Sequence, residues 1–248
     1  MTELERIEQL EKEIRKLKGL NENSIPSYSY SDIKLKDLEK LLTIERDIID
    51  KESLNRWLDN DSILNDTTIS FLKHLIERNI ELINNYDEED LKINFIAPLI
   101  TEVDYFMLKD DIRSFYHEPL RYETEKFIFK GRADMMVSKG LFTAKKPYFF
   151  LQEFKKGFVS TNPEPQLLAE LISAVELNDE ISMKGCYVIG SRWNFVILEK
   201  ISVGHYKYFV SRDFNCVNLE DLKEIYKNLM FIKNEIIKSV KKEKNNSL

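Results

Sequence analysis

The sequence predicts an α/β fold in which helices flank a mixed sheet, preceded by a helical N-terminal extension. Strand-length apolar runs, typical of a sheet covered on both faces, occur at Tyr148–Phe154, Lys184–Gly190 and Asn194–Lys200. Helix-length segments with helical spacing of apolar residues lie before and between these runs, at Asp87–Val103 and Gln166–Leu177. The predicted order is therefore a helix, strands, a second helix and further strands.

The composition is that of a globular protein. The chain has 248 residues, of which 43% are hydrophobic and 32% charged, enough for one sizeable domain with a helical extension. No apolar run approaches the roughly twenty residues of a membrane span, and the N-terminus has no signal-peptide pattern. The two cysteines, Cys186 and Cys216, are too few for a disulfide framework. We expect a cytoplasmic protein without membrane contact.

Charge is distributed unevenly along the chain. The net charge is −6, but residues 109–156 hold 11 Lys/Arg against 7 Asp/Glu, a net of +4. Residues 1–104 hold 14 Lys/Arg against 24 Asp/Glu, a net of −10. A local excess of basic residues is what a phosphate backbone requires, so a nucleic-acid partner remains compatible with the acidic total.

The basic stretch also contains the residues with the clearest chemical pattern. We expect a strand around Ala133–Val137 that carries Asp134, then a turn and the Tyr148–Phe154 strand, which ends near Glu153 and Lys155. Side chains alternate across a strand, so Glu153 and Lys155 should point to the same face. Charges at the end of an apolar strand are costly without partners, and Asp134 on the neighbouring strand could share a metal ion with them.

An Asp followed nineteen positions later by Glu-x-Lys resembles the PD-(D/E)XK nuclease superfamily, and the resemblance extends from about Asp87 to Glu199. The chain also resembles a group of uncharacterised bacterial proteins with an N-E-x-E-L-like helix start, an F-I-x-P-L helix and a P-Y-F-F-L-x-E-F/Y-K strand. This resemblance implies a restriction-endonuclease-like α-β-β-β-α-β core that hydrolyses phosphodiester bonds with a bound metal ion.

The resemblance also implies roles for individual residues. Asp134 and Glu153 would ligate Mg²⁺ or Mn²⁺, together with the backbone carbonyl of Phe154, and Glu88 would complete the shell or a second metal position. Lys155 would orient or deprotonate the attacking water, or stabilise charge in the transition state. A surface salt bridge between Asp134 and Lys155 is the alternative explanation of the same residues.

The helix predicted at Asp87–Val103 supplies the acidic candidate. Glu88 lies three residues before Leu91 and so continues the apolar stripe of this helix, with Glu89 as the second choice. The alternative is an acidic first turn in solvent that complements the helix dipole. Pro98 predicts a kink or a broken hydrogen bond within the helix.

Three further residues were candidates for contacts with a substrate. Gln166 opens the helix after the Glu-x-Lys strand, where family members place a Gln or Lys beside the site; ordinary capping is the alternative. Arg192 and Trp193 could hold a phosphate and stack a base, or Trp193 could pack at the edge of the core. For His117, no partner is evident from the sequence.

The N-terminal part carries no chemistry that the sequence identifies. Residues 1–20 have a short heptad seam, which predicts either a helix packed on its own chain or a dimerisation helix, and hence a homodimer through residues 1–20. We predict the divisions 1–25 for this helix, 26–85 for a helical region and 86–248 for the nuclease-like domain. Helix is expected from about Ser31 through Leu58, and again from Asp66 or Thr67.

The function that the sequence predicts is metal-dependent hydrolysis of nucleic acid by a DNA endonuclease, in a defence or mobile-element system. One alternative is a non-catalytic module of the same fold that binds nucleic acid or a protein partner. Another is an interaction protein built around the N-terminal helices. The sequence contains no P-loop, G-x-G-x-x-G, H-E-x-x-H or C-x-x-C motif, which argues against the enzyme classes that depend on them.

Overall fold

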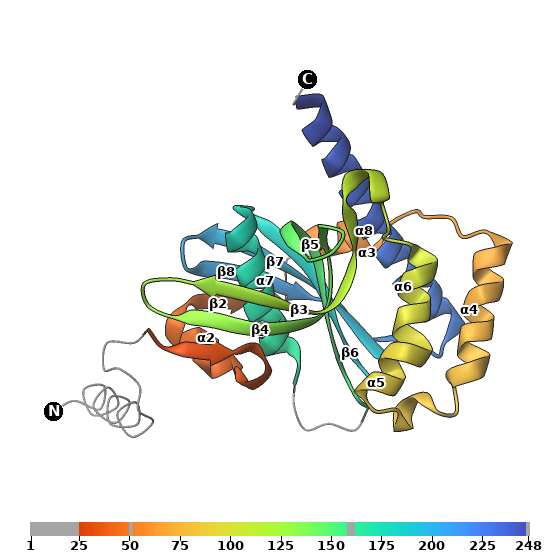
Figure 1. Cartoon of the computed structure of the whole chain (residues 1–248). Helices are drawn as coiled ribbons and strands as arrows, with labels where there is room; N and C mark the ends of the chain where they lie inside the picture. Colours follow the sequence, from red (N-terminus) through yellow and green to blue (C-terminus); the bar gives the residue numbers. More distant parts are fainter. Residues whose placement is uncertain (1–24, 50–51, 158–161, 247–248) are drawn as a thin grey trace.

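The computed structural model describes residues 25–49, 52–157 and 162–246, and confirms an α/β fold. The described residues form a nine-stranded mixed sheet with the order β1-β4-β5-β6-β7-β8-β2, in which β3 also pairs with β4 and β9 with β7 (Figure 1). The strands are β1 (Ser27–Ser29), β2 (Thr43–Arg46), β3 (Ile112–Glu123), β4 (Ile128–Lys139), β5 (Lys145–Lys155), β6 (Ser182–Ile189), β7 (Arg192–Ser202), β8 (His205–Val210) and β9 (Phe214–Asn215).

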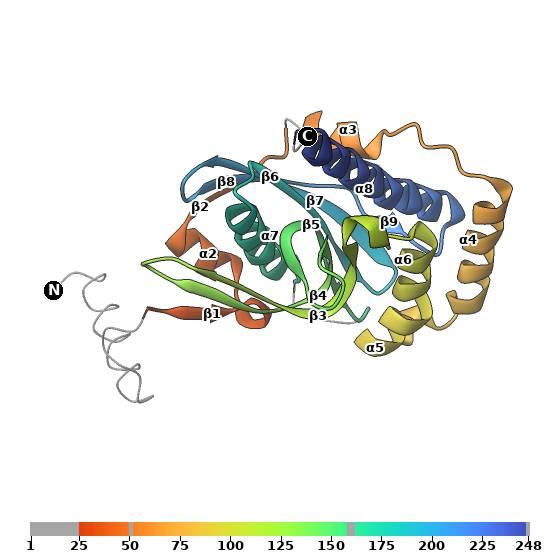
Figure 2. The same cartoon turned by 45° about the horizontal axis from the view of Figure 1, so that its top comes forward.

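Helices cover both faces of the sheet, as Figures 1 and 2 show. The helices are α2 (Leu35–Leu41), α3 (Glu52–Leu58), α4 (Asp66–Asn79), α5 (Glu88–Leu91), α6 (Ala97–Val103), α7 (Glu164–Asn178) and α8 (Leu219–Asn246). Helix α7 packs on one face with a core that includes Leu151 of β5. Helices α3, α4, α5, α6 and α8 share the other core, which includes Phe150 and Phe154 of the same strand. Successive side chains of β5 therefore lie in different cores, one on each face of the sheet, which confirms the expected two-sided burial.

The helix expected through residues 31–58 is wrong at its centre. Thr43–Arg46 form β2, which pairs in parallel with β8 at the edge of the sheet, and α3 is described from Glu52. The β-branched pair Thr43 and Ile44 favours an extended chain, and the unpaired edge of β8 supplies the hydrogen bonds that a helix would otherwise make. Residues 1–20, for which the heptad helix was predicted, lie outside the described residues.

The segment 26–85 is joined to the rest of the chain through the sheet and through one core. Strand β1 pairs in parallel with the start of β4, at Ile128–Lys130. Trp57 of α3 is fully buried, and its Nε1 donates to the carbonyl oxygen of Asn228 on α8 at 3.0 Å. Its ring lies edge-on to Phe195, with centroids 5.0 Å apart. Segments far apart in sequence therefore share one packed interior.

The helical segment before β3 is interrupted near Pro98, as predicted. Helix α5 continues into a π-helical turn at Lys92–Ile96, and α6 follows with Pro98 in its first turn. Proline lacks an N–H, so the carbonyl four residues earlier cannot receive the usual helical bond, and a wider turn accommodates this loss. Within the described residues, no helix combines the length and apolarity needed to cross a membrane.

Candidate metal centre

The pairing between β4 and β5 ends where the candidate residues begin. The last paired residues at this end are Met135 and Gln152. Beyond this pair, side-chain carboxylates accept hydrogen bonds from the backbone N–H groups of the opposite strand. The Asp134 N–H donates to Glu153 Oε1 at 3.2 Å, and the Phe154 N–H donates to Asp134 Oδ2 at 3.0 Å. The two carboxylates are thus held by the backbone of the opposite strand, which fixes their position at the end of the ladder.

A second buried carboxyl group meets Glu153 from the helix above. Glu153 and Glu170 of α7 are both 0% exposed. Burial, followed by the nearby Glu170 and Asp134 carboxyls, raises the pKa of Glu153 well above its usual range. Burial likewise raises the pKa of Glu170, to about 8. The pair therefore holds a proton at neutral pH in the metal-free protein, because two adjacent buried carboxylates repel each other.

Gln166, a residue that the sequence analysis selected, lies beside this group through its contact with Glu170. Its Nε2 lies 3.4 Å from Glu170 Oε1. Gln166 is in the first turn of α7, and its side chain is buried. The sequence analysis did not select Glu170. The available signal was its spacing of four residues from Gln166, which places both on one face of the helix. An acidic residue in the otherwise apolar run L-L-A-E-L-I was the further sign that this face meets a polar site.

Lys155 lies between two acidic side chains. Its Nζ is 3.9 Å from Glu153 Oε2 and 3.9 Å from Glu88 Oε2. Glu153 and Lys155 therefore point to the same face of β5, as predicted. The next residue, Lys156, is exposed. Glu88 opens α5 and is half-exposed, so it reaches the site from outside through Lys155. Its neighbour Glu89 contacts other residues.

The backbone carbonyl of Phe154 was the remaining predicted metal ligand. The structure shows the Phe154 N–H bound to Asp134 and the phenyl ring buried in the core on the α8 side. Trp193 is also fully buried, so the alternative in which it stacks a base is wrong and its packing in the core is confirmed. His117 does have partners: Lys92 Nζ lies 2.9 Å from its Nε2.

The donor set suits a hard divalent cation. Glu153 Oε2 and Glu170 Oε2 are buried, and neither has a hydrogen-bond partner within the described part of the chain. An orphaned buried carboxylate oxygen is costly unless a proton or a cation compensates it, and oxygen donors are those that Mg²⁺ and Mn²⁺ prefer. As the side chains stand, no group of three or more His, Cys, Asp or Glu among the described residues is arranged as a ready metal site. A cation would have to displace the proton that the raised pKa values of Glu153 and Glu170 favour.

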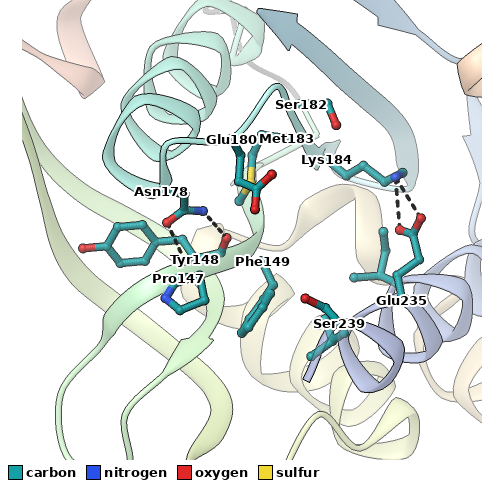
Figure 3. A pocket seen from close by; sticks show the side chains of 12 residues that line it. Pro147, Tyr148, Phe149, Asn178, Glu180, Ser182, Met183, Lys184, Glu235 and Ser239 are labelled. Carbon is teal, nitrogen blue, oxygen red and sulfur yellow. Dashed lines mark hydrogen bonds and ion pairs between the residues drawn. The ribbon is translucent and has the colours of Figure 1, made fainter. Parts of the chain in front are cut away.

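A separate hollow of about 250 Å³ lies at the opposite end of β5, near Pro147 and Phe149. Figure 3 shows Asn178 turned toward the backbone of Tyr148 there, and Lys184 turned toward Glu235. Lys184 Nζ lies 3.0 Å from Glu235 Oε2, so these two charges compensate each other. None of the acidic residues Asp134, Glu153 and Glu170 of the candidate metal centre lines this hollow.

In comparisons with known proteins, no family model matches the chain, and no curated protein matches it either.

Proposed function

We propose that this protein is a metal-dependent nuclease of the PD-(D/E)XK type, which hydrolyses phosphodiester bonds in nucleic acid, with DNA as the expected substrate. The observation that carries the proposal is the convergence of Asp134, Glu153 and Lys155 at the open end of the β4–β5 ladder. The element order also supports it: the helical segment α5–α6, then β3, β4, β5, α7 and β6, follows the α-β-β-β-α-β order that the resemblance implies.

The residues have separable tasks in this reaction. Asp134 and Glu153 would hold Mg²⁺ or Mn²⁺, with Glu170 as a further buried oxygen donor. The bound cation would supply charge neutralisation on the phosphoryl oxygens and a more acidic water. Lys155 Nζ, near Glu153 Oε2, is placed to orient the attacking water or to stabilise developing negative charge. Glu88 positions Lys155 by pairing with it from outside the cluster.

The decisive experiment compares two lysines that are adjacent in sequence and lie in different surroundings. We expect Lys155→Met to reduce metal-dependent cleavage of a plasmid or a labelled RNA by at least about a hundredfold, the usual scale for loss of an acid–base or charge-stabilising group. Lys156→Met changes an exposed residue beyond the end of β5 and should retain most of the activity. Equal activity of both variants would contradict the assignment of Lys155.

A non-catalytic module that binds nucleic acid or a protein partner is the second candidate. The feature that favours it is that the raised pKa values of Glu153 and Glu170 favour their protonated forms, which need no cation. Calorimetric titration of Mg²⁺ or Mn²⁺ into the wild type and into Glu153→Gln separates the two candidates. The nuclease predicts metal binding that the variant loses. Nucleic-acid binding with no metal binding and no cleavage would favour the module.

A further inference from the structure

His117 of β3 lies directly across from Asp134 and has an irregular backbone within the strand. Tyr116 pairs with Met135 and Glu118 pairs with Ala133, so His117 and Asp134 both lie between these two pairs. The backbone of His117 has φ 55°, in the left-handed region, and its carbonyl oxygen accepts a hydrogen bond from Arg132 Nη1 at 2.6 Å. A left-handed residue with a side chain is costly, and residues held in such sparsely populated conformations often lie beside active sites.

The imidazole of His117 meets a lysine that is largely withdrawn from solvent. Lys92 Nζ lies 2.9 Å from His117 Nε2, and the Lys92 side chain is only 13% exposed. Both groups face the same carboxylate: Lys92 Nζ donates to Glu89 Oε1, and His117 Nε2 lies 3.5 Å from that oxygen. The hydrogen bond from Lys92 lowers the pKa of Glu89. Two nitrogen groups on different elements therefore share one carboxylate.

The first turn of α5 spans the candidate metal centre. Glu88 pairs with Lys155 on β5, whereas the next residue, Glu89, reaches His117 on β3. Strand β4, with Asp134, lies between β3 and β5 in the sheet. Lys92 and His117 therefore flank Asp134 on the β3 side, and Lys155 flanks it on the β5 side.

We propose that Lys92 and His117 form a phosphate-binding pair on the β3 side of the metal centre, and that the Glu89 carboxylate occupies this pair until a substrate phosphate displaces it. This inference rests on the proposed function, because it assigns the pair to the backbone of the same nucleic acid. A phosphate oxygen accepts from the Lys92 ammonium as the Glu89 carboxylate oxygen does, while His117 Nε2 accepts from the same ammonium and holds it in position.

The surroundings of the pair favour exchange of this anion. The Glu89 side chain is 61% exposed, so it can leave without unfolding the helix, whereas Lys92 stays held in place by its burial. Arg132, which lies on β4 two residues before Asp134, is exposed and adds a further cation at this edge. An ordinary lysine–glutamate pair one turn apart on a helix surface would need neither a histidine with a left-handed backbone nor a lysine that is largely withdrawn from solvent.

The test measures binding without cleavage. Fluorescence anisotropy of labelled duplex DNA, single-stranded DNA and RNA is recorded in EDTA for the wild type, Lys92→Met, His117→Asn and Glu89→Gln. Removing Lys92 should weaken binding about tenfold, as expected for a lost hydrogen bond to a charged group. The slope of log K against log salt on duplex DNA should fall by about 0.9 for one lost phosphate contact. Glu89→Gln should bind more tightly, because the competing carboxylate is gone.

The matched control is another lysine–glutamate pair of the same spacing. On α8, Lys223 Nζ lies 2.8 Å from Glu220 Oε1, and Lys223→Met and Glu220→Gln should leave affinity and salt slope close to wild type. If wild type binds but neither Lys92→Met nor His117→Asn changes affinity or slope, the pair is structural and this inference falls while the proposed function stands. Unchanged or weaker binding by Glu89→Gln also overturns it, and this outcome does not depend on a substitution of Lys92. A wild type that binds none of the three nucleic acids overturns both proposals.

Discussion

Asp134 and Glu153 are each held by the other's strand: the Asp134 N–H donates to Glu153 Oε1 at 3.2 Å, and Asp134 Oδ2 accepts from the Phe154 N–H at 3.0 Å. This exchange occupies one oxygen of each carboxylate. Glu153 Oε2 remains without a hydrogen-bond partner among the described residues. The same bonds that close the end of the ladder therefore leave Glu153 Oε2 facing Lys155, whose Nζ lies 3.9 Å away.

Asp134→Asn should separate folding from metal binding. An asparagine carbonyl oxygen can still accept from the Phe154 N–H, so we expect the free energy of unfolding to change by less than about 1 kcal/mol. Asp134→Ala leaves that N–H without its partner and should cost about 1–2 kcal/mol more. Both variants should lose Mg²⁺ binding. Urea unfolding and calorimetry measure the two effects, and an Asn variant that binds Mg²⁺ as tightly as wild type would remove Asp134 from the centre.

The Glu153–Glu170 pair predicts a stability that falls as pH rises. Its raised pKa values mean that the folded state keeps a proton that the unfolded chain releases above about pH 4.3. The stabilising contribution is complete below that pH and is lost as pH rises through the raised value, which for Glu170 is about 8. In EDTA, the free energy of unfolding should decline by up to about 1.4 kcal/mol per pH unit for each retained proton.

Glu170→Gln supplies the comparison for this prediction. Glutamine cannot ionise, so the variant should lose part of the pH dependence and gain stability relative to wild type at pH 8. Added Mg²⁺ should stabilise the wild type most at this pH, because the cation replaces the proton. Urea denaturation at pH 5.5, 7 and 8 measures both. A difference between variant and wild type that does not change with pH would contradict the raised pKa values.

Sequence patterns predicted those parts of the candidate centre that depend on neighbours along the chain. Glu153 and Lys155 share a face because strand side chains alternate, and the order of helices and strands followed from local periodicity. Glu170 was missed because an acidic residue on a helix is usually solvated, and only the packing of α7 on β5 buries it. The position of His117 opposite Asp134 depends on the register of β3 against β4, which no local pattern specifies. Strand β2 was missed because its partner, β8, lies far along the chain.

Gln152 should limit stability because its amide is buried without partners. It is 0% exposed, and neither its Nε2 nor its Oε1 has a hydrogen-bond partner among the described residues. Gln152→Met keeps a similar volume and removes the desolvated amide, so we expect a gain of about 1–2 kcal/mol in the free energy of unfolding. Gln166→Met, which removes an amide that contacts Glu170, should give no gain. Equal gains in urea unfolding for both variants would refute this explanation.

Trp57 should make the segment 26–85 unfold together with the rest of the sheet and α8. It contacts Phe150 and Phe195 of the sheet and donates to Asn228 of α8. Trp57→Ala should therefore cost about 3–5 kcal/mol of the free energy of unfolding, whereas Ile63→Ala, at a side chain that is 96% exposed, should stay within about 0.5 kcal/mol.

The two tryptophans of the chain allow this coupling to be observed directly. Trp193→Phe leaves Trp57 on α3 as the sole tryptophan reporter, and Trp57→Phe leaves Trp193 on β7. One cooperative unit requires that, in each variant, fluorescence and circular dichroism follow the same denaturation curve. If the curve reported by Trp57 preceded that of the secondary structure, residues 26–85 would be a separately unfolding layer. The core around the sheet would then stay folded after the Trp57 ring had left it.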